Sequence, residues 1–342
     1  MIVPRRAALA TKGSAALLGE FRLALLGVAL LVPSLAHASG YNFTDVINPG
    51  DPAFNQELGI NNSGVIGGYF GDGTVVFNNG YTVVLPSSFT AENFPGAVQT
   101  QVVAINSAGD TAGFYIDNMG TNHGFVKVGG TFYTIDDPAG VFNQLLGLND
   151  SLTAAGYYQN AMNTQFPFTA TSLTSSPTFT PVPDLPMNTG AQATGVNNAG
   201  LIVGFYVDSM SGNTYGYIVN PMTNAFTQLA FPGSTFTQAL GENNNGTVVG
   251  DYMDAGGNTH GFAYSGGSFM TVDDPLGSGT MTVINGVNDQ GQLVGFYMDA
   301  HNNTIGLEAN PTPEPGSFVF TGLSGLLTGL GWLGTRKRSS RR

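Results

Sequence analysis

Aspartate recurs at one place in the sequence pattern, and its carboxylate is the first group to consider for chemistry. Four aspartates each follow a predicted strand: Asp117, Asp208, Asp254 and Asp299. Two Asp-Asp pairs, at 136–137 and 273–274, precede prolines. Rings of carboxylates would suit calcium, which prefers oxygen ligands, but no stretch has the spacing of an EF-hand loop. Because Asp also begins turns readily, we predict structural roles and no cofactor, with calcium as the alternative.

The motifs of familiar catalysts are missing from the sequence. His123 and His260 share one repeat position, but Tyr215 and Ile305 stand there in other units, which argues against metal ligation. Neither HExxH, nor GxSxG, nor a phosphate-binding glycine-rich loop is present. The lack of cysteine excludes a thiol nucleophile. The sequence therefore predicts a protein that is not an enzyme.

Two acidic residues break the pattern around them. Glu242 stands where the other units have Ile, Leu or Val, and Asp251 stands where they have Phe or Tyr. A buried carboxylate without a partner is costly, and two such acids in one unit can form a binding or catalytic site. The alternative is that this end of the strand is exposed to solvent. We name Glu242 and Asp251 as the candidate ligand site.

These residues belong to a unit that repeats six times. A motif of an apolar residue, Asn, a polar stretch and usually Gly begins at six positions: Gly59, Ala104, Gly147, Gly195, Gly241 and Gly286. The starts are 45, 43, 48, 46 and 45 residues apart, a length typical of a four-stranded propeller blade. Further strand-like segments follow each motif. In the second, fourth and fifth units the last segment has the pattern Phe-x-x-aliphatic-x-x-Pro, at Phe132, Phe226 and Phe269, and the first and third units have degraded forms of it.

The two ends of the array indicate how it closes. The sixth unit ends near Asn310 without its last strand, whereas residues 43–49 supply that pattern before the first unit. A first strand that completes the last blade hides an exposed sheet edge. We therefore predict an all-β, six-bladed propeller over residues 39–310, closed by the N-terminal strand. An open β-solenoid of six repeats is the alternative.

The third unit departs from the others. Between Asn160 and Ala193 it is rich in Ser, Thr and Pro. We expect a longer loop or an irregular outer strand there. The repeat resumes in phase at Gly195, so this stretch is not a domain boundary.

Charge is distributed very unevenly. Of ten basic residues only Lys127 lies between the two ends, whereas 21 of 22 acidic residues fall between Asp45 and Glu314. The body thus has a formal charge of about −20. Nucleic acid is excluded as a partner, because phosphate binding depends on Lys and Arg. A cationic partner, a divalent metal or an uncharged glycan would be compatible with this charge.

The N-terminus has the order of a secretory signal peptide. Four basic residues within 1–22 precede an apolar run at 23–35, and Ala36-His37-Ala38 follow this run. Small residues at Ala36 and Ala38 indicate cleavage after Ala38. The apolar run is shorter than the roughly 20 residues that span a bilayer. We predict a signal peptide at 1–38, with an N-terminal membrane anchor as the alternative.

The C-terminus, residues 311–342, reads as a sorting segment. An uncharged stretch at 316–335 is just long enough to span a membrane. Five basic residues within the last seven place the tail in the cytoplasm and the body outside. With Pro313, Glu314 and Pro315 on its motif, the segment resembles the PEP-CTERM sorting signal. That resemblance implies processing by an exosortase at the surface of a Gram-negative-type bacterium that makes exopolysaccharide; a retained transmembrane anchor is the alternative.

The repeats have a resemblance of their own. The core G-[IV]-N-x-x-G-x-[IV]-V-G-[FY] is best kept in the units that begin at Gly195 and Gly286. Over residues 41–310 the chain resembles the extracellular HAF repeats. The resemblance implies an extracellular repeat protein and carries no catalytic residues.

Together these features predict an exported cell-envelope protein. We expect its propeller to be a non-catalytic module that binds or scaffolds extracellular glycan or matrix protein. Its other partners would be the secretion machinery and the exosortase, with membrane contact only through the C-terminal helix before processing. A secreted carbohydrate-active enzyme and a structural surface-layer protein are the alternatives.

Overall fold

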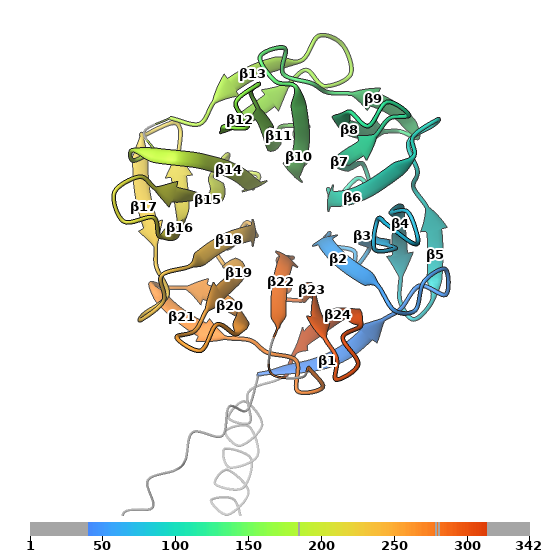
Figure 1. Cartoon of the computed structure of the whole chain (residues 1–342), viewed down its shortest axis with the longest axis vertical. Helices are drawn as coiled ribbons and strands as arrows, with labels where there is room; N and C mark the ends of the chain where they lie inside the picture. Colours follow the sequence, from blue (N-terminus) through green and yellow to red (C-terminus); the bar gives the residue numbers. More distant parts are fainter. Residues whose placement is uncertain (1–39, 184, 278, 280, 313–342) are drawn as a thin grey trace, which may run out of the picture. The chain divides into compact units, whose positions relative to one another are not determined.

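The computed structural model describes residues 40–183, 185–277, 279 and 281–312. Within these residues the regular elements are all β-strands, which form six four-stranded antiparallel sheets. Figure 1 shows the sheets as blades around a central axis. No helix in these ranges is long and apolar enough to cross a membrane. The predicted signal peptide and most of the predicted sorting segment lie outside the described residues.

Each blade runs from an inner strand at the axis to an outer strand at the rim. Blade 1 contains β2 (Asn55–Ile60), β3 (Ile66–Phe70), β4 (Asn79–Val84) and β5 (Ser88–Ala91). Blade 2 contains β6 (Gln99–Ile105), β7 (Thr111–Ile116), β8 (Asn122–Val128) and β9 (Thr131–Thr134). Blade 3 contains β10 (Phe142–Leu148), β11 (Ala154–Gln159), β12 (Gln165–Thr171) and β13 (Thr178–Pro181).

The second half of the ring repeats this plan until the last strand. Blade 4 contains β14 (Asn188–Val196), β15 (Ile202–Asp208), β16 (Thr214–Asn220) and β17 (Ala225–Leu229). Blade 5 contains β18 (Thr237–Glu242), β19 (Val248–Met253), β20 (Thr259–Ser265) and β21 (Ser268–Thr271). Blade 6 contains β22 (Thr282–Val287), β23 (Leu293–Met298), β24 (Thr304–Pro311) and β1 (Tyr41–Val46).

The N-terminal strand closes the ring. β1 pairs antiparallel with β24, from Tyr41 opposite Pro311 to Val46 opposite Gly306. β24 therefore has a neighbour on both sides, and blade 6 has four strands like the other blades. The predicted six-bladed propeller closed by the N-terminal strand is confirmed, and the solenoid alternative is wrong.

A glycine lets neighbouring inner strands approach closely at the axis. Each inner strand is bulged next to the first residue of its motif, as between Leu145 and Gly147. A Cβ added to Gly59 would lie 2.8 Å from the carbonyl oxygen of Val103, and one on Gly147 would lie 2.8 Å from the Cα of Gly195. No side chain fits at such distances, which explains the glycine that begins most of the motifs.

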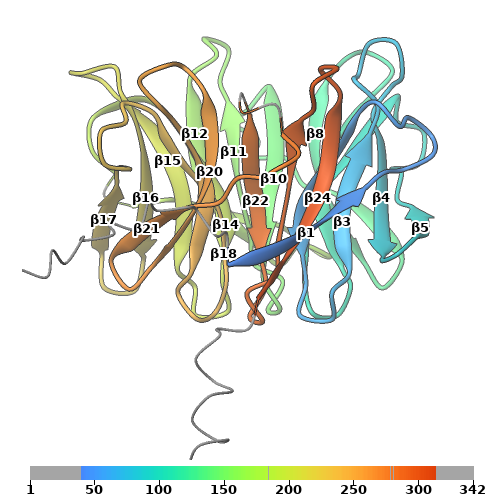
Figure 2. The same cartoon turned by 90° about the horizontal axis from the view of Figure 1, so that it is seen from below.

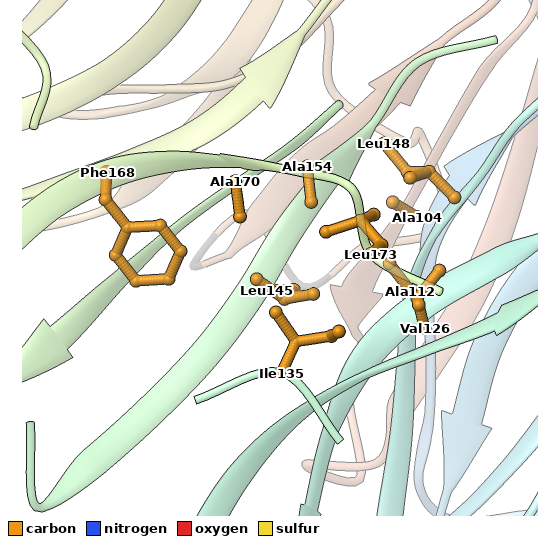
Figure 3. Packing of buried hydrophobic residues seen from close by; sticks show 10 residues of the cluster. All are labelled: Ala104, Ala112, Val126, Ile135, Leu145, Leu148, Ala154, Phe168, Ala170 and Leu173. Carbon is orange, nitrogen blue, oxygen red and sulfur yellow. The ribbon is translucent and has the colours of Figure 1, made fainter. Parts of the chain in front are cut away.

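The core lies between blades. Figure 3 shows one such layer, in which Leu145 of β10 lies near Ile135 at the end of blade 2 and Phe168 of β12. All three side chains are buried, and each contributes roughly 1.5–3 kcal/mol by leaving water. Gly124 on β8, the third strand of blade 2, makes room for the side chain of Leu145. A Cβ atom added to Gly124 would lie only 3.2 Å from Cγ of Leu145. Each inner strand is thus held against the blade before it.

The ring has two different faces, seen edge-on in Figure 2. The turn face carries the six Asn turns that join inner and second strands. The loop face carries the loops between second and third strands and the linkers between blades. β24 runs toward the turn face, where the N–H of Thr312 donates to the carbonyl oxygen of Gly40 at 2.7 Å. Both ends of the described chain therefore lie on the turn face.

Blade 3 keeps four regular strands despite its unusual composition. β13 pairs with β12 from Pro181 opposite Phe168 to Thr178 opposite Thr171. The outer strand is therefore regular. The longer loop that was the other expectation is present, because residues 172–177 join β12 to β13, whereas residues 129–130 make the same connection in blade 2.

Ring closure predicts the effect of removing β1. A chain that starts at residue 51 should unfold at a lower temperature than one that starts at residue 39. It loses the ladder with β24 and the burial of Val46, which alone contributes about 2 kcal/mol. The thermal midpoint should fall by at least several degrees. Equal midpoints for the two chains would show that β1 does not close the ring.

Candidate functional site

The six inner strands line an axial channel whose side chains lie in layers. At the turn face the first layer is polar: Asn62, Ser107, Asp150, Asn198, Asn244 and Asp289. The repeat asparagines form the second layer. The third is an aliphatic ring: Ile60, Ile105, Leu148, Val196 and Val287, with Glu242 as its sixth member. Five glutamines surround a wider mouth of about 300 Å³ at the loop face: Gln56, Gln101, Gln144, Gln192 and Gln238.

An unbroken ring of hydrogen bonds links the six repeat asparagines. Within each turn the Oδ1 atom accepts backbone N–H groups, as Asn61 does from Ser63 and Val65 at 3.0 Å. Each Nδ2 donates to the backbone carbonyl of the next asparagine, at 2.9–3.4 Å, in the order Asn61, Asn106, Asn149, Asn197, Asn243, Asn288 and back to Asn61. Asparagine recurs because one short side chain must both accept within its turn and donate to the next blade.

Glu242 ends β18 and lies in the aliphatic ring of the axial channel. Its Oε1 atom is buried and has no hydrogen-bond partner among the described residues. Burial raises the pKa of this carboxyl well above its usual range, with a smaller opposing effect from the backbone N–H of Asn197. The carboxyl is therefore held toward its neutral form. It borders cavities of about 80 Å³, enough for water or a small polar ligand.

Asp251 lies on the other face of the same blade. It pairs with Gln238, whereas Glu242 pairs with Val248. Val248 and Asp251 are three residues apart on β19, so their side chains point to opposite faces of the sheet. Glu242 shares the face of its partner Val248, so Glu242 and Asp251 point away from each other, roughly 10 Å apart along the strand. Burial raises the pKa of Asp251 to about 7. The structure thus buries Asp251, half-buries Glu242, and does not bring them to one site.

The predicted sorting residues are outside the described part of the chain. Ala36 and Ala38 precede its first residue, and Pro313, Glu314 and Pro315 follow its last. Their roles stay predictions.

Sequence reasoning missed a third anomalous acid, Glu57. It replaces an apolar residue of the inner strand and inserts between blade 1 and blade 6, where a Cβ on Gly306 would lie 2.6 Å from its Oε1. The hydroxyl of Tyr81 donates to Oε1, while Oε2 is buried without a partner in the described ranges. Burial raises the pKa of Glu57 to about 8, against a lowering by the Tyr81 bond. The sequence did carry a signal for Glu57, because the equivalent positions in blades 3 and 6 hold the apolar residues Leu145 and Ile284.

The recurring aspartates shape loops, as the sequence predicts. Asp254, for example, accepts the backbone N–H groups of Gly256 and Asn258 at 2.8 and 2.9 Å. It also lies 3.3 Å from Nε2 of His260, whose Nδ1 is 2.8 Å from Asp273. Burial lowers the pKa of His260, but the two carboxylates outweigh it and raise the pKa overall. No group of three or more His, Asp or Glu side chains in the described ranges is placed to hold a metal ion.

Blades 2 and 5 carry the same aromatic stack near the loop face. In blade 2 the ring of Phe94 lies parallel to that of Tyr115, with 3.8 Å between centroids. His123 lies 5.0 Å from the same tyrosine ring. The counterparts in blade 5 are Phe231, Tyr252 and His260, at 3.5 and 5.2 Å. Each phenylalanine comes from the linker that enters the blade and precedes a proline, so the linker supplies a ring that covers the tyrosine.

Blade 3 places different side chains on the same backbone. Strand register puts Tyr158 at the position of Tyr115, and Phe166 at that of His123. The linker residue before the proline is Asp137 in place of Phe94. The backbone N–H of Asp137 donates to the side chain of Asn143, just as that of Phe94 donates to Thr100, so the two linkers have equivalent backbone positions here.

One face of Tyr158 therefore lacks the ring that covers Tyr115 in blade 2 and Tyr252 in blade 5. Its aromatic neighbours within the described chain are Phe166 and Phe168, with centroids 5.1 and 6.4 Å away. Asp137 is too short to cover a phenol ring as a phenylalanine does. Tyr158 is accordingly half-buried, whereas Tyr115 is buried.

The hydroxyl of Tyr158 also lacks the partner found in other blades. In blade 2 the hydroxyl of Tyr115 bonds to Thr134 of the outer strand at 2.9 Å. Register places Pro181 at that position in blade 3, and a proline side chain cannot hydrogen-bond. Over the described ranges the Tyr158 hydroxyl makes no hydrogen bond, so it is available to a ligand.

These changes open a groove at the loop-face rim of blade 3. The blade 3 groove has a volume of about 610 Å³, within the range of small-molecule sites. Its lining includes Asp137, Tyr158, Gln165, Phe166, Val182 and Asn188. Phe166 is 39% exposed, which is high for an aromatic residue. The groove combines a flat apolar wall with a carboxylate, two amides and a phenol, an arrangement suited to a ring that carries hydroxyl groups.

Glu242 generates a prediction about stability. The Glu242→Leu variant should be more stable than the wild type by about 1–2 kcal/mol, because the change removes an unpartnered buried carboxyl and completes the aliphatic ring. Urea unfolding measures the difference, and Glu242→Gln is the control that keeps the shape. A destabilised leucine variant would indicate that the carboxyl has a bound partner in solution.

The raised pKa values generate a prediction about pH. Glu57 and Asp251 bind protons more tightly when folded, so the stability they confer is full below their unfolded pKa values and is lost as pH rises toward 7–8. His123 and His260, with raised pKa values, act in the same direction. The free energy of unfolding should fall between about pH 5 and pH 8, and less steeply in Glu57→Gln. A flat or rising profile for the wild type would contradict this assignment.

Comparison with known proteins supports the fold. No family model matches the sequence, and no curated protein matches it significantly. The AofleA structure from Arthrobotrys oligospora is 12% identical, covers 78% of this chain and 86% of its own, and has a TM-score of 0.50. The six-bladed Aleuria aurantia lectin is also 12% identical, covers 78% of this chain and 99% of its own, and has a TM-score of 0.46. The Hadza microbial sialidase Hz136 is 11% identical, covers 77% of this chain and 66% of its own, and has a TM-score of 0.47. At these identities the likeness extends to the propeller fold and does not assign a function.

Proposed function

We propose that this chain is a non-catalytic carbohydrate-binding module of an exported envelope protein, and that the blade 3 groove is its binding site. The observation that carries the proposal is the uncovered face of Tyr158. In blades 2 and 5 a parallel phenyl ring fills that place. A sugar ring with its C–H face against Tyr158 would occupy it in blade 3.

The polar groups of the groove match a polyhydroxylated ring. Asp137 accepts hydrogen bonds, and the side-chain amides of Gln165 and Asn188 both donate and accept. The hydroxyl of Tyr158 can do either. A ligand held between an apolar wall and such groups buries its C–H face and keeps its hydroxyl groups bonded. The acidic body disfavours nucleotides and other phosphate-bearing rings.

The sequence signals at the two ends support export. The signal peptide at 1–38 directs the chain to the secretion machinery, and the PEP-CTERM-like segment directs it to an exosortase. The described chain ends on the turn face, and the groove opens at the loop face. A propeller tethered through its C-terminus would therefore present the groove on the side away from the tether.

No specific observation favours an enzyme. Glycoside hydrolysis uses two carboxylates about 5–10 Å apart that flank one bond. Glu242 and Asp251 lie on opposite faces of blade 5. Glu57 is buried in the seam between blades 1 and 6, away from the groove in blade 3.

A substitution that copies the neighbouring blades tests the proposal. In Asp137→Phe the new ring should stack on Tyr158 as Phe94 does on Tyr115. Glycan-array binding by residues 39–312 should then fall at least about tenfold, while stability is kept or raised, because an aromatic pair contributes about 0.5–1.5 kcal/mol. The array is read with calcium and with chelator, and thermal midpoints verify folding.

A matched control separates the groove from its surroundings. Met162→Ala changes an exposed loop tip of the same blade and should leave binding unchanged. If a folded Asp137→Phe protein binds glycan like the wild type, the groove is not the site. If the wild type binds no glycan, the proposal fails, and a scaffold or self-assembly role takes its place.

A further inference from the structure

Within the proposed function, on which this inference rests, we infer that the blade 3 groove selects a glycan carrying a free, protonated amino group. Such a sugar is a cationic amino sugar, as opposed to its N-acetylated or acidic relatives. The inference follows from the charges that surround the site of the missing phenyl ring.

Asp137 brings a carboxylate to the edge of that site. Its Oδ1 atom accepts the backbone N–H of Ala139 at 2.9 Å, which fixes the side chain against its own linker. Its Oδ2 atom accepts no hydrogen bond from the described chain, so it is available to a ligand. The carboxylate is close to Tyr158, whose pKa is raised by burial and then by the charge of Asp137. One carboxylate oxygen is thus available beside the open tyrosine face.

The protein supplies no cation to neutralise that carboxylate. Lys127 is the only Lys or Arg between residues 39 and 312. Its Nζ lies 2.6 and 2.8 Å from the two carboxylate oxygens of Glu92, so it is already paired. The imidazoles of His123 and His260 lie between aspartates of their own blades. The amides of Gln165 and Asn188 are uncharged.

This balance ranks three classes of sugar. A uronic or sialic acid would place a second carboxylate beside Asp137 with no counter-charge, which disfavours binding. A neutral sugar would stack on Tyr158 and donate a hydroxyl group to the Asp137 carboxylate. A protonated amine would donate to the same carboxylate and add the attraction between opposite charges. The free-amine sugar should therefore bind most tightly.

Three matched oligosaccharides test the ranking. Oligomers of β-1,4-linked glucosamine, N-acetylglucosamine and glucuronic acid are titrated calorimetrically into residues 39–312, in mild acid that protonates the amine. The amine form should bind about five- to tenfold more tightly than the acetylated form, and the acid form most weakly. Raising the salt concentration should narrow the gap, because ions screen an exposed pair.

Two variants separate local from general charge. Asp137→Asn should bring the ratio of amine to acetyl affinity close to one. Asp208→Asn removes a loop-face charge from blade 4 and should keep the wild-type ratio; Asn160 holds the equivalent loop position in blade 3, so asparagine fits. A ratio that falls equally in both variants would show a general attraction of polycations and overturn the inference.

The remaining outcomes distinguish the inference from the function it rests on. If the amine and acetyl forms bind equally and Asp137→Phe abolishes both, the charge selection is wrong and the groove stands as a glycan site. If no oligosaccharide of any class binds the wild type on the array or by calorimetry, the proposed function itself fails.

Discussion

The structure depends on a hydrogen bond that each blade makes to the next. The Nδ2 group of every repeat asparagine donates to the backbone of its neighbour, and the last of these bonds joins Asn288 to Asn61 across the closing seam. The same side chains hold their own turns through Oδ1. Local turn geometry and the position of the next blade are therefore set by one residue. Glycines such as Gly147 then allow the inner strands to meet at the axis.

Because this frame places equivalent residues in equivalent positions, a departure in one blade has a local and interpretable effect. Blade 3 differs from blade 2 at three such positions: Asp137, Phe166 and Pro181. The first uncovers a tyrosine face, the second keeps the opposite face apolar, and the third leaves the hydroxyl of Tyr158 without a partner. All three positions line the groove, and the strands around it are intact. A binding site arises here where blade 3 lacks the covering phenylalanine that blades 2 and 5 carry.

The repeat frame was predictable from the sequence, whereas the groove was not. Six motif starts and the offset of residues 43–49 were enough to predict six blades and the closing strand. The positions of Glu242 and Asp251 on opposite faces depend on the bulge in β18, which no sequence pattern reveals. The groove joins residues from two linkers and four strands. Its one visible signal was Asp-Pro in the linker before blade 3, where the linkers before blades 2 and 5 have Phe-Pro; the linker before blade 6 has Asp-Pro as well, so the dipeptide alone does not mark a groove.

The central claim is that the open face of Tyr158 takes a sugar ring. The most direct measurement is a crystal structure of residues 39–312 with a bound oligosaccharide. The account predicts a sugar ring parallel to Tyr158, in the place that Phe94 and Phe231 fill in their own blades, with a hydroxyl or amino group on Asp137. A sugar bound at another blade, or a side chain of the protein lying over Tyr158 in the complex, would contradict it.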